Sequence, residues 1–102
     1  MSEYEYTGSG LRHFLNVIRK DFPRYFNVRE VLEESSSNKK FTDEEYNKHT
    51  ERIRRYFVYA VDKGWVKALG DLDQDKDVKF RLTAAGIDAL NKRRGIVDYL
   101  KI

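Results

Sequence analysis

Apolar residues recur at intervals of three or four positions through the centre of the chain. The recurring positions are Tyr46, Thr50, Ile53, Phe57 and Ala60. This interval places side chains on one face of an α-helix, whereas a strand would alternate every second residue. The pattern therefore predicts one long amphipathic helix, with its apolar face toward a core.

The ends of this helix carry recognisable signals. Thr42 and Glu45 have the spacing of a capping box, in which each side chain accepts a hydrogen bond from the other residue's backbone N–H. Such a cap contributes about 0.5–2 kcal/mol. Gly64 supplies the residue type that ends helices in a left-handed conformation. We therefore expect the helix to span residues 42–63.

Two short apolar runs follow the long helix. Residues 65–69 and 78–82 alternate partly between apolar and polar side chains, and the polar run 71–77 separates them. This arrangement predicts an antiparallel hairpin with a long tip. Thr83 then has the type of a helix N-cap, followed by a helix with Ile87 and Leu90 facing inward.

The N-terminal part predicts two shorter helices after a tail. Residues 1–10 read as a flexible tail, because they end in Gly8-Ser9-Gly10. A first helix is expected over 11–20 and a second after Asn27, its expected N-cap, and a polar connector then leads to Thr42. Residues 11–102 are thus expected to form one domain.

The order of these elements resembles the winged helix-turn-helix superfamily of DNA-binding domains. The resemblance covers about half of the chain. It rests on the apolar stripe of the long helix, the step Gly64-Trp65-Val66, the hairpin, and the segment 82–86 that opens the last helix. It implies an α+β, mainly helical fold: a winged helix with three helices, a two-stranded β-hairpin wing and a C-terminal helix. The connector before Thr42 is longer than in the simplest helix-turn-helix, which leaves the angle between the second and third helices open.

The resemblance implies binding of double-stranded DNA, in the manner of a transcriptional regulator, with helix 42–63 in the major groove. Arginine can bond guanine edges and asparagine can bond adenine there. The candidate contact residues are Lys39, Lys40, Asn47, Lys48, Arg52, Arg54 and Arg55. At the base of the hairpin, Lys67, Lys79 and Arg81 could also reach phosphates.

A protein-interaction module of the same fold is the alternative. Glu44 and Glu51 lie four residues before Lys48 and Arg55, the spacing of ion pairs on a solvated helix face. A continuous basic face would favour DNA, and a face broken by Glu51 and the aspartates would favour a protein partner. In that second case the acidic hairpin tip, Val58, Tyr59 and the C-terminal segment would be the contact surfaces.

Net charge and composition give only a slight preference between a DNA partner and a protein partner. The 102-residue chain has a net charge of +3, and residues 71–77 carry −3, because four aspartates stand against Lys76, so the rest carries +6. That balance favours a polyanionic partner if the charges share one face. The absence of cysteine fits a reducing compartment. With no long apolar run and a polar, acidic N-terminus, we expect a cytoplasmic protein that contacts no membrane.

The sequence offers no catalytic motif. There is no cysteine and no phosphate-binding glycine loop, and His13 and His49 lie on different predicted helices. The aspartates at 71, 73 and 75 have the spacing that opens a calcium loop, but Lys76 stands where that loop needs glycine. We expect neither an enzyme nor a cofactor or metal site. The apolar segment 96–102 could pack back on its own domain or on a second copy, and we expect it to join two copies into a homodimer.

Overall fold

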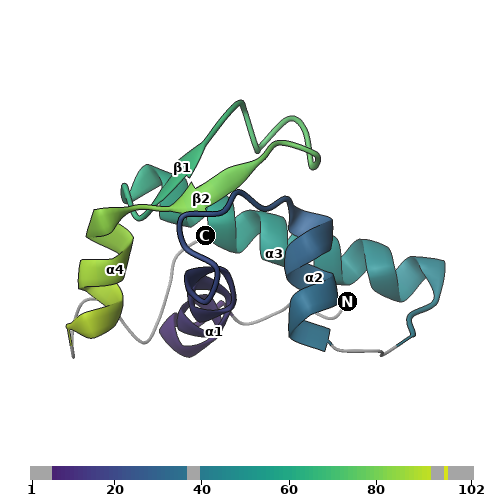
Figure 1. Ribbon diagram of the computed structural model, residues 1–102. Coiled ribbons are helices and arrows are strands. Elements are labelled where there is room, and N and C mark those ends of the chain that lie inside the picture. Colours follow the sequence, from purple (N-terminus) through teal and green to yellow (C-terminus); the bar gives the residue numbers. More distant parts are fainter. Residues whose placement is uncertain (1–5, 37–39, 93–95, 97–102) are drawn as a thin grey trace.

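The fold is mainly helical, with a small antiparallel sheet, in a computed structural model that describes residues 6–36, 40–92 and 96. The helices surround a core that the sheet closes on one side (Figure 1). This arrangement confirms the α+β class. The elements in chain order are α1 (Gly8–Arg19), α2 (Val28–Ser36), α3 (Asp43–Asp62), β1 (Val66–Ala68), β2 (Phe80–Leu82) and α4 (Ala84–Asn91).

Helix α3 has the limits that its sequence predicts. Thr42 Oγ1 accepts the Glu45 N–H at 3.2 Å, and Glu45 Oε1 accepts the Thr42 N–H at 3.1 Å, which completes the capping box. After the helix, Gly64 adopts a φ of +79°, the left-handed conformation that favours glycine. Thr83 likewise caps α4, with its hydroxyl oxygen 3.0 Å from the Gly86 N.

Helix α1 begins earlier than the sequence predicts. Its N-cap is Thr7, whose Oγ1 accepts the Gly10 N–H at 3.0 Å, so the glycines at 8 and 10 lie inside the helix. Tyr6 packs edge-on against Tyr56 of α3, with ring centroids 5.2 Å apart. The predicted tail therefore does not extend to residue 10, and residues 1–5 lie outside the described part. A threonine cap and a tertiary aromatic contact outweigh the flexibility that two glycines suggest.

Helix α2 starts with a second capping box, formed by Asn27 and Glu30. Asn27 Oδ1 accepts the Glu30 N–H at 2.9 Å, and Glu30 Oε1 accepts the Asn27 N–H at 3.1 Å. Glu30 also pairs with Arg24 at 2.7 Å and with Lys79 next to β2. One carboxylate thus joins the start of α2, the segment before it and the hairpin.

We expect Glu30→Gln to lower the free energy of unfolding by about 1 kcal/mol at pH 7, because it removes the partly exposed ion pairs with Arg24 and Lys79. Glutamine can keep the capping box, since its amide oxygen still accepts the Asn27 N–H. Urea unfolding of the variant and the parent measures the difference.

The same comparison should depend on pH. Burial raises the pKa of Glu30, but the hydrogen bonds from Lys79 and from the Asn27 N–H outweigh it and hold the pKa below its ordinary value. A carboxylate with a lowered folded pKa stabilises the fold above its unfolded pKa of about 4.3, and this contribution is lost as the pH falls through the folded pKa. The difference between parent and Glu30→Gln should therefore shrink below pH of about 4. A constant difference down to pH of about 2 would contradict this role.

An isolated backbone bridge lies beside the two-stranded sheet. Strands β1 and β2 pair antiparallel, with Lys67 opposite Arg81. On the other side of β2, Phe26 and Phe80 exchange backbone hydrogen bonds of 2.7 and 2.8 Å. The segment between α1 and α2 therefore runs along β2 (Figure 1). Both strands are shorter than the predicted 65–69 and 78–82.

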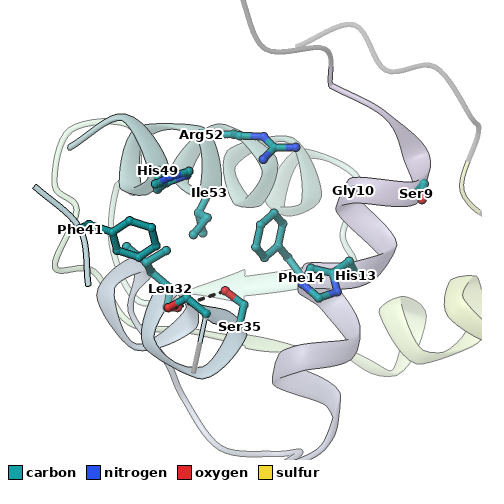
Figure 2. A pocket seen from close by; sticks show the side chains of 11 residues that line it. Ser9, Gly10, His13, Phe14, Leu32, Ser35, Phe41, His49, Arg52 and Ile53 are labelled. Carbon is teal, nitrogen blue, oxygen red and sulfur yellow. Dashed lines mark hydrogen bonds between the residues drawn. The ribbon is translucent and has the colours of Figure 1, made fainter. Parts of the chain in front are cut away.

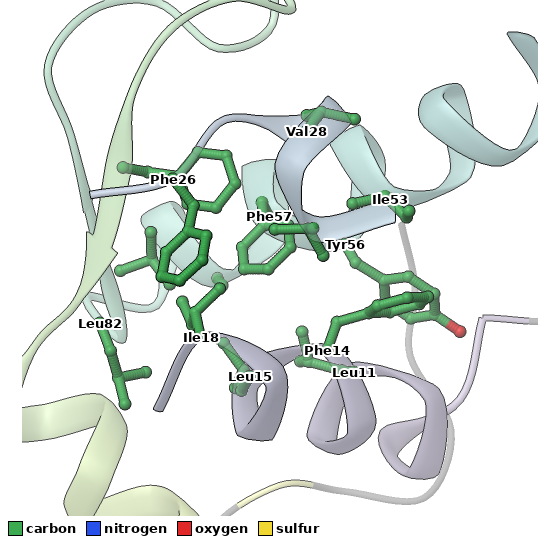
Figure 3. Close-up of a cluster of buried hydrophobic side chains, with 14 of the residues drawn as sticks. Leu11, Phe14, Leu15, Ile18, Phe26, Val28, Ile53, Tyr56, Phe57 and Leu82 are labelled. Atoms are coloured by element: carbon green, nitrogen blue, oxygen red, sulfur yellow. The ribbon is translucent and has the colours of Figure 1, made fainter. Parts of the chain in front are cut away.

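The core lies between α1, α3 and the sheet (Figure 3). At its centre, the ring of Phe57 from α3 stacks on the ring of Phe80 from β2, with centroids 4.3 Å apart. Leu15 and Ile18 approach this pair from α1, and both are buried. The predicted stripe of α3 therefore faces the core, and Tyr56 joins it as a fully buried residue.

Ile96 belongs to this core rather than to a free surface. Its side chain is buried, and Arg12 of α1 donates a hydrogen bond to its carbonyl at 3.4 Å. The remainder of the predicted dimer segment, residues 97–102, lies outside the described residues. Among the helices described, none has the length and apolar character needed to cross a bilayer.

Candidate nucleic-acid interface

The α3 flank, defined here as Lys48, Arg52 and Arg55, follows the middle of α3 outside the core stripe. The Lys48 and Arg55 side chains are 52% and 50% exposed. The intervals of four and three residues place the three cations one turn apart along the helix. Asn47 and Lys40 are also exposed, and Lys39 lies outside the described residues.

Acidic residues interrupt the α3 flank. Glu44 lies 3.6 Å from Lys48, and Glu51 lies 3.4 Å from Arg55, at the predicted spacing of four residues. The hydrogen bond from Arg54 is the largest influence on Glu51 and holds its pKa below the ordinary value. The basic face is therefore discontinuous, which is the pattern that favours a protein partner.

The Arg54 side chain is mostly buried and is bound by acidic residues of the protein itself. Its side chain is only 12% exposed and binds Glu51 one turn earlier. Its guanidinium also donates to Asp73 of the β1–β2 loop, at 2.9 Å to Oδ1 and 3.0 Å to the backbone carbonyl. The hydrogen bond to Glu51, followed by the one to Asp73, raises the pKa of Arg54 against the opposing effect of burial. Among the predicted contact residues, Arg54 is thus occupied in holding the loop against α3.

The β1–β2 loop, residues 71–77, folds back onto the helices. Leu72 is buried, and Asp77 lies 3.6 Å from Arg29 of α2. The carboxylates of Asp71 and Asp75 accept backbone N–H groups within the loop. The expected long hairpin tip is therefore held by both α2 and α3, because one apolar side chain and two cations anchor it.

The surface made by α3 and this loop is acidic overall. Residues 43–55 contain four acidic and four basic side chains, which cancel, and residues 71–77 carry −3. The two segments together therefore carry −3, and the remaining residues of the +3 chain carry +6. The net positive charge of the chain is therefore carried by residues outside these two segments.

A cavity of about 480 Å³ opens between α1, α2 and α3 (Figure 2). Phe14, Leu32 and Ile53 give it an apolar lining, and Arg52 lies at one side. The guanidinium carbon of Arg52 is also 5.6 Å from the centroid of the Tyr56 ring. Arg52 thus combines a place on the α3 flank with packing against the core, which the sequence did not show.

The polar side chains around this cavity make contacts within the protein. His49 lies beside Phe41, with ring centroids 4.8 Å apart, and His13 lies on the opposite side of the cavity (Figure 2). The hydroxyls of Ser35 and Ser36 donate to the Leu32 carbonyl at 3.1 and 2.6 Å. Within the described residues, no three histidine or acidic side chains gather where they could hold a metal ion.

Neither this cavity nor the anchored loop was predicted from the sequence. The cavity residues come from three helices with no shared spacing, so no sequence signal marks them. Leu72, an apolar residue within an acidic run, was a signal for the anchored loop. Comparison of the chain with protein-family models, with curated proteins and with solved structures finds no match.

Proposed function

We propose that this chain binds double-stranded DNA as a transcriptional regulator of winged-helix type, with the middle of α3 directed toward the major groove. The observation that carries the proposal is the spacing of Lys48, Arg52 and Arg55 along one flank of a firmly anchored helix. A helix of this diameter fits the major groove, and its arginines can bond guanine edges.

The order of elements supports this proposal. Two helices precede α3, and a hairpin and a further helix follow it. This is the order on which the resemblance to winged helix-turn-helix domains rests, and in helix-turn-helix proteins the second helix of the motif enters the groove. Phe57 and Ile53 hold α3 in the core, so its outer flank has a defined direction.

The ion pairs on the flank do not prevent phosphate binding. Both Lys48–Glu44 and Arg55–Glu51 are exposed pairs with separations above 3 Å. Exposed pairs contribute about 0–1 kcal/mol, so a phosphate can replace the carboxylate as the partner at small cost. The acidic first turn and the loop would repel the backbone, which directs the contact to the middle of α3.

Lys48→Ala combined with Arg55→Ala should weaken duplex binding and lower its salt dependence. Each lost phosphate contact reduces the slope of log affinity against log salt by about 0.9, so the double variant should lose about 1.8. A salt titration of a labelled random duplex, followed by fluorescence anisotropy, measures both affinity and slope.

The matched control is Lys20→Ala combined with Lys92→Ala, which removes two exposed positive charges at the C-terminal ends of α1 and α4. Under the proposal this control keeps the parent's slope. The proposal is wrong if the parent shows no duplex binding at low salt, or if the α3 double variant binds as the parent does.

A protein-interaction module is the second candidate function, and the charge balance favours it. The net −3 of residues 43–55 and the anchored loop suits a basic protein surface better than a phosphate backbone. Val58 and Tyr59, named as contacts for this case, are half-buried against the core. The contact would therefore rest on the exposed acidic residues, and absence of duplex binding by the parent would support it.

We also propose that two copies associate through the segment 96–102. The inward position of Ile96 leaves residues 97–102 as the part that would reach a partner. Two-fold dimers are the commonest oligomers and match palindromic sites. Light scattering should give a dimer mass for the parent and a monomer mass after deletion of residues 97–102. A parent that is monomeric at high concentration would exclude the dimer.

A further inference from the structure

The outer sheet face, defined here as Phe22, Tyr25, Lys67, Lys79 and Arg81, is a second charged surface on the opposite side of the sheet from the core. Side chains alternate along β1 and β2, so that Val66, Phe80 and Leu82 are buried and Lys67 is exposed. The backbone bridge between Phe26 and Phe80 brings the preceding residue, Tyr25, next to β2.

Two cations on this face lie directly opposite one another. Lys67 pairs with Arg81 across the two strands, and like charges in that position repel. Neither side chain forms an ion pair with any residue within the described ranges. The neighbouring Lys79 is different, because Glu30 partners it. An anion between Lys67 and Arg81 would remove their repulsion.

Aromatic side chains border the two cations. The Arg81 guanidinium carbon lies 5.1 Å from the centroid of the Tyr25 ring. The side chain of Phe22 is 45% exposed, which is unusual for so large an apolar group. Phe22, Lys67 and Arg81 together line a hollow of about 290 Å³. Cations that can follow a phosphate backbone, beside rings on which bases can stack, characterise surfaces for single-stranded nucleic acids.

We infer that the outer sheet face binds single-stranded nucleic acid, with Lys67 and Arg81 on the phosphates and Phe22 stacked on a base. An acidic polypeptide could also pair with the two cations, but its carboxylates would not stack on the exposed Phe22 ring beside the hollow. This site lies on the hairpin and on the segment before α2, whereas the α3 flank lies on α3. The inference therefore does not depend on the proposed duplex binding.

The test is binding of a labelled oligothymidylate of about 15 nucleotides to the full chain, measured by fluorescence anisotropy. Lys67→Ala combined with Arg81→Ala should lower the slope of log affinity against log salt by about 1.4, since single strands lose about 0.7 per phosphate contact. Phe22→Ala should weaken binding about tenfold with an unchanged slope. Lys67→Glu serves as a second test at an exposed position and should also weaken binding.

The matched control is Lys76→Ala combined with Lys92→Ala, which removes two exposed cations outside this face and should bind oligothymidylate as the parent does. Thermal unfolding followed by circular dichroism shows that each variant is folded. The inference is overturned if the parent does not bind, or if the control variant loses as much affinity as the sheet variant. It is also overturned if polyglutamate competes as well as the oligonucleotide and Phe22→Ala changes nothing, which would assign the face to an acidic polypeptide. If the α3 double variant loses duplex binding but still binds oligothymidylate, the outer sheet face is unaffected. The proposal of duplex binding and the inference of single-strand binding can therefore be refuted independently.

Discussion

Phe57→Ala is expected to lower the free energy of unfolding by about 3–5 kcal/mol, the usual cost of removing a buried phenylalanine ring. Phe57 is fully buried and stacks on Phe80, so its loss leaves a cavity between α3 and the sheet. A small domain has a total stability of about 5–15 kcal/mol, so this variant should be close to unfolding at room temperature. Urea unfolding followed by circular dichroism measures the change.

Leu69→Ala is the matched control for this variant. The Leu69 side chain is 60% exposed, so its truncation should change stability by less than about 0.5 kcal/mol. If Phe57→Ala unfolds at the same urea concentration as the parent, Phe57 is not at the centre of the core.

Gly86→Ala is expected to destabilise the protein by about 1–3 kcal/mol, although alanine is normally preferred to glycine inside a helix by about 1 kcal/mol. A Cβ at this position would lie 2.2 Å from the backbone oxygen of Trp65 and 2.7 Å from Leu82 Cδ1. The Trp65 carbonyl also accepts the Thr83 N–H at 3.0 Å. Making room for one methyl group would therefore disturb the junction between β1 and α4.

Gly64→Ala is the comparison variant, because it introduces backbone strain without the steric clash expected at Gly86. No atom lies within 4 Å of a Cβ at Gly64, and the cost arises only from its φ of +79°, about 1–2 kcal/mol. Thermal unfolding of both variants gives the comparison. A Gly86→Ala variant as stable as the parent would show that α4 can shift away from Trp65 without penalty.

Local signals predicted the limits of α3, where the stabilising contacts are close in sequence. The capping box of Thr42 and Glu45 and the left-handed Gly64 lie within a few residues of the helix ends they define. Helix α1 differs, because its start depends on Thr7 and on Tyr6 packing against Tyr56, a contact between residues fifty positions apart in the chain. A pattern within the first ten residues cannot show that contact.

The residues of the candidate site could be predicted from the sequence, but their contacts in the folded protein could not. The sequence placed Lys48, Arg52 and Arg55 on one flank, and it showed the acids at pairing distance. It could not show that Arg54 turns to Asp73, nineteen residues later, because that contact requires the loop to fold back over Leu72. It also could not place Tyr25 beside Arg81, since the bridge between Phe26 and Phe80 joins segments far apart in the chain.

The sequence by itself determined the mainly helical α+β class, the long central helix with its buried stripe, and the uneven distribution of charge. These properties follow from residue periodicity and caps, which act over one or two helical turns. Only the tertiary structure decided which charges neutralise one another and which stay available to a partner. Arg54 and Glu30 are engaged by distant residues, whereas Lys67 and Arg81 are brought together without an acidic partner among the described residues. The reason is physical: interactions between charges depend on distance in space, and the packing of the core sets those distances.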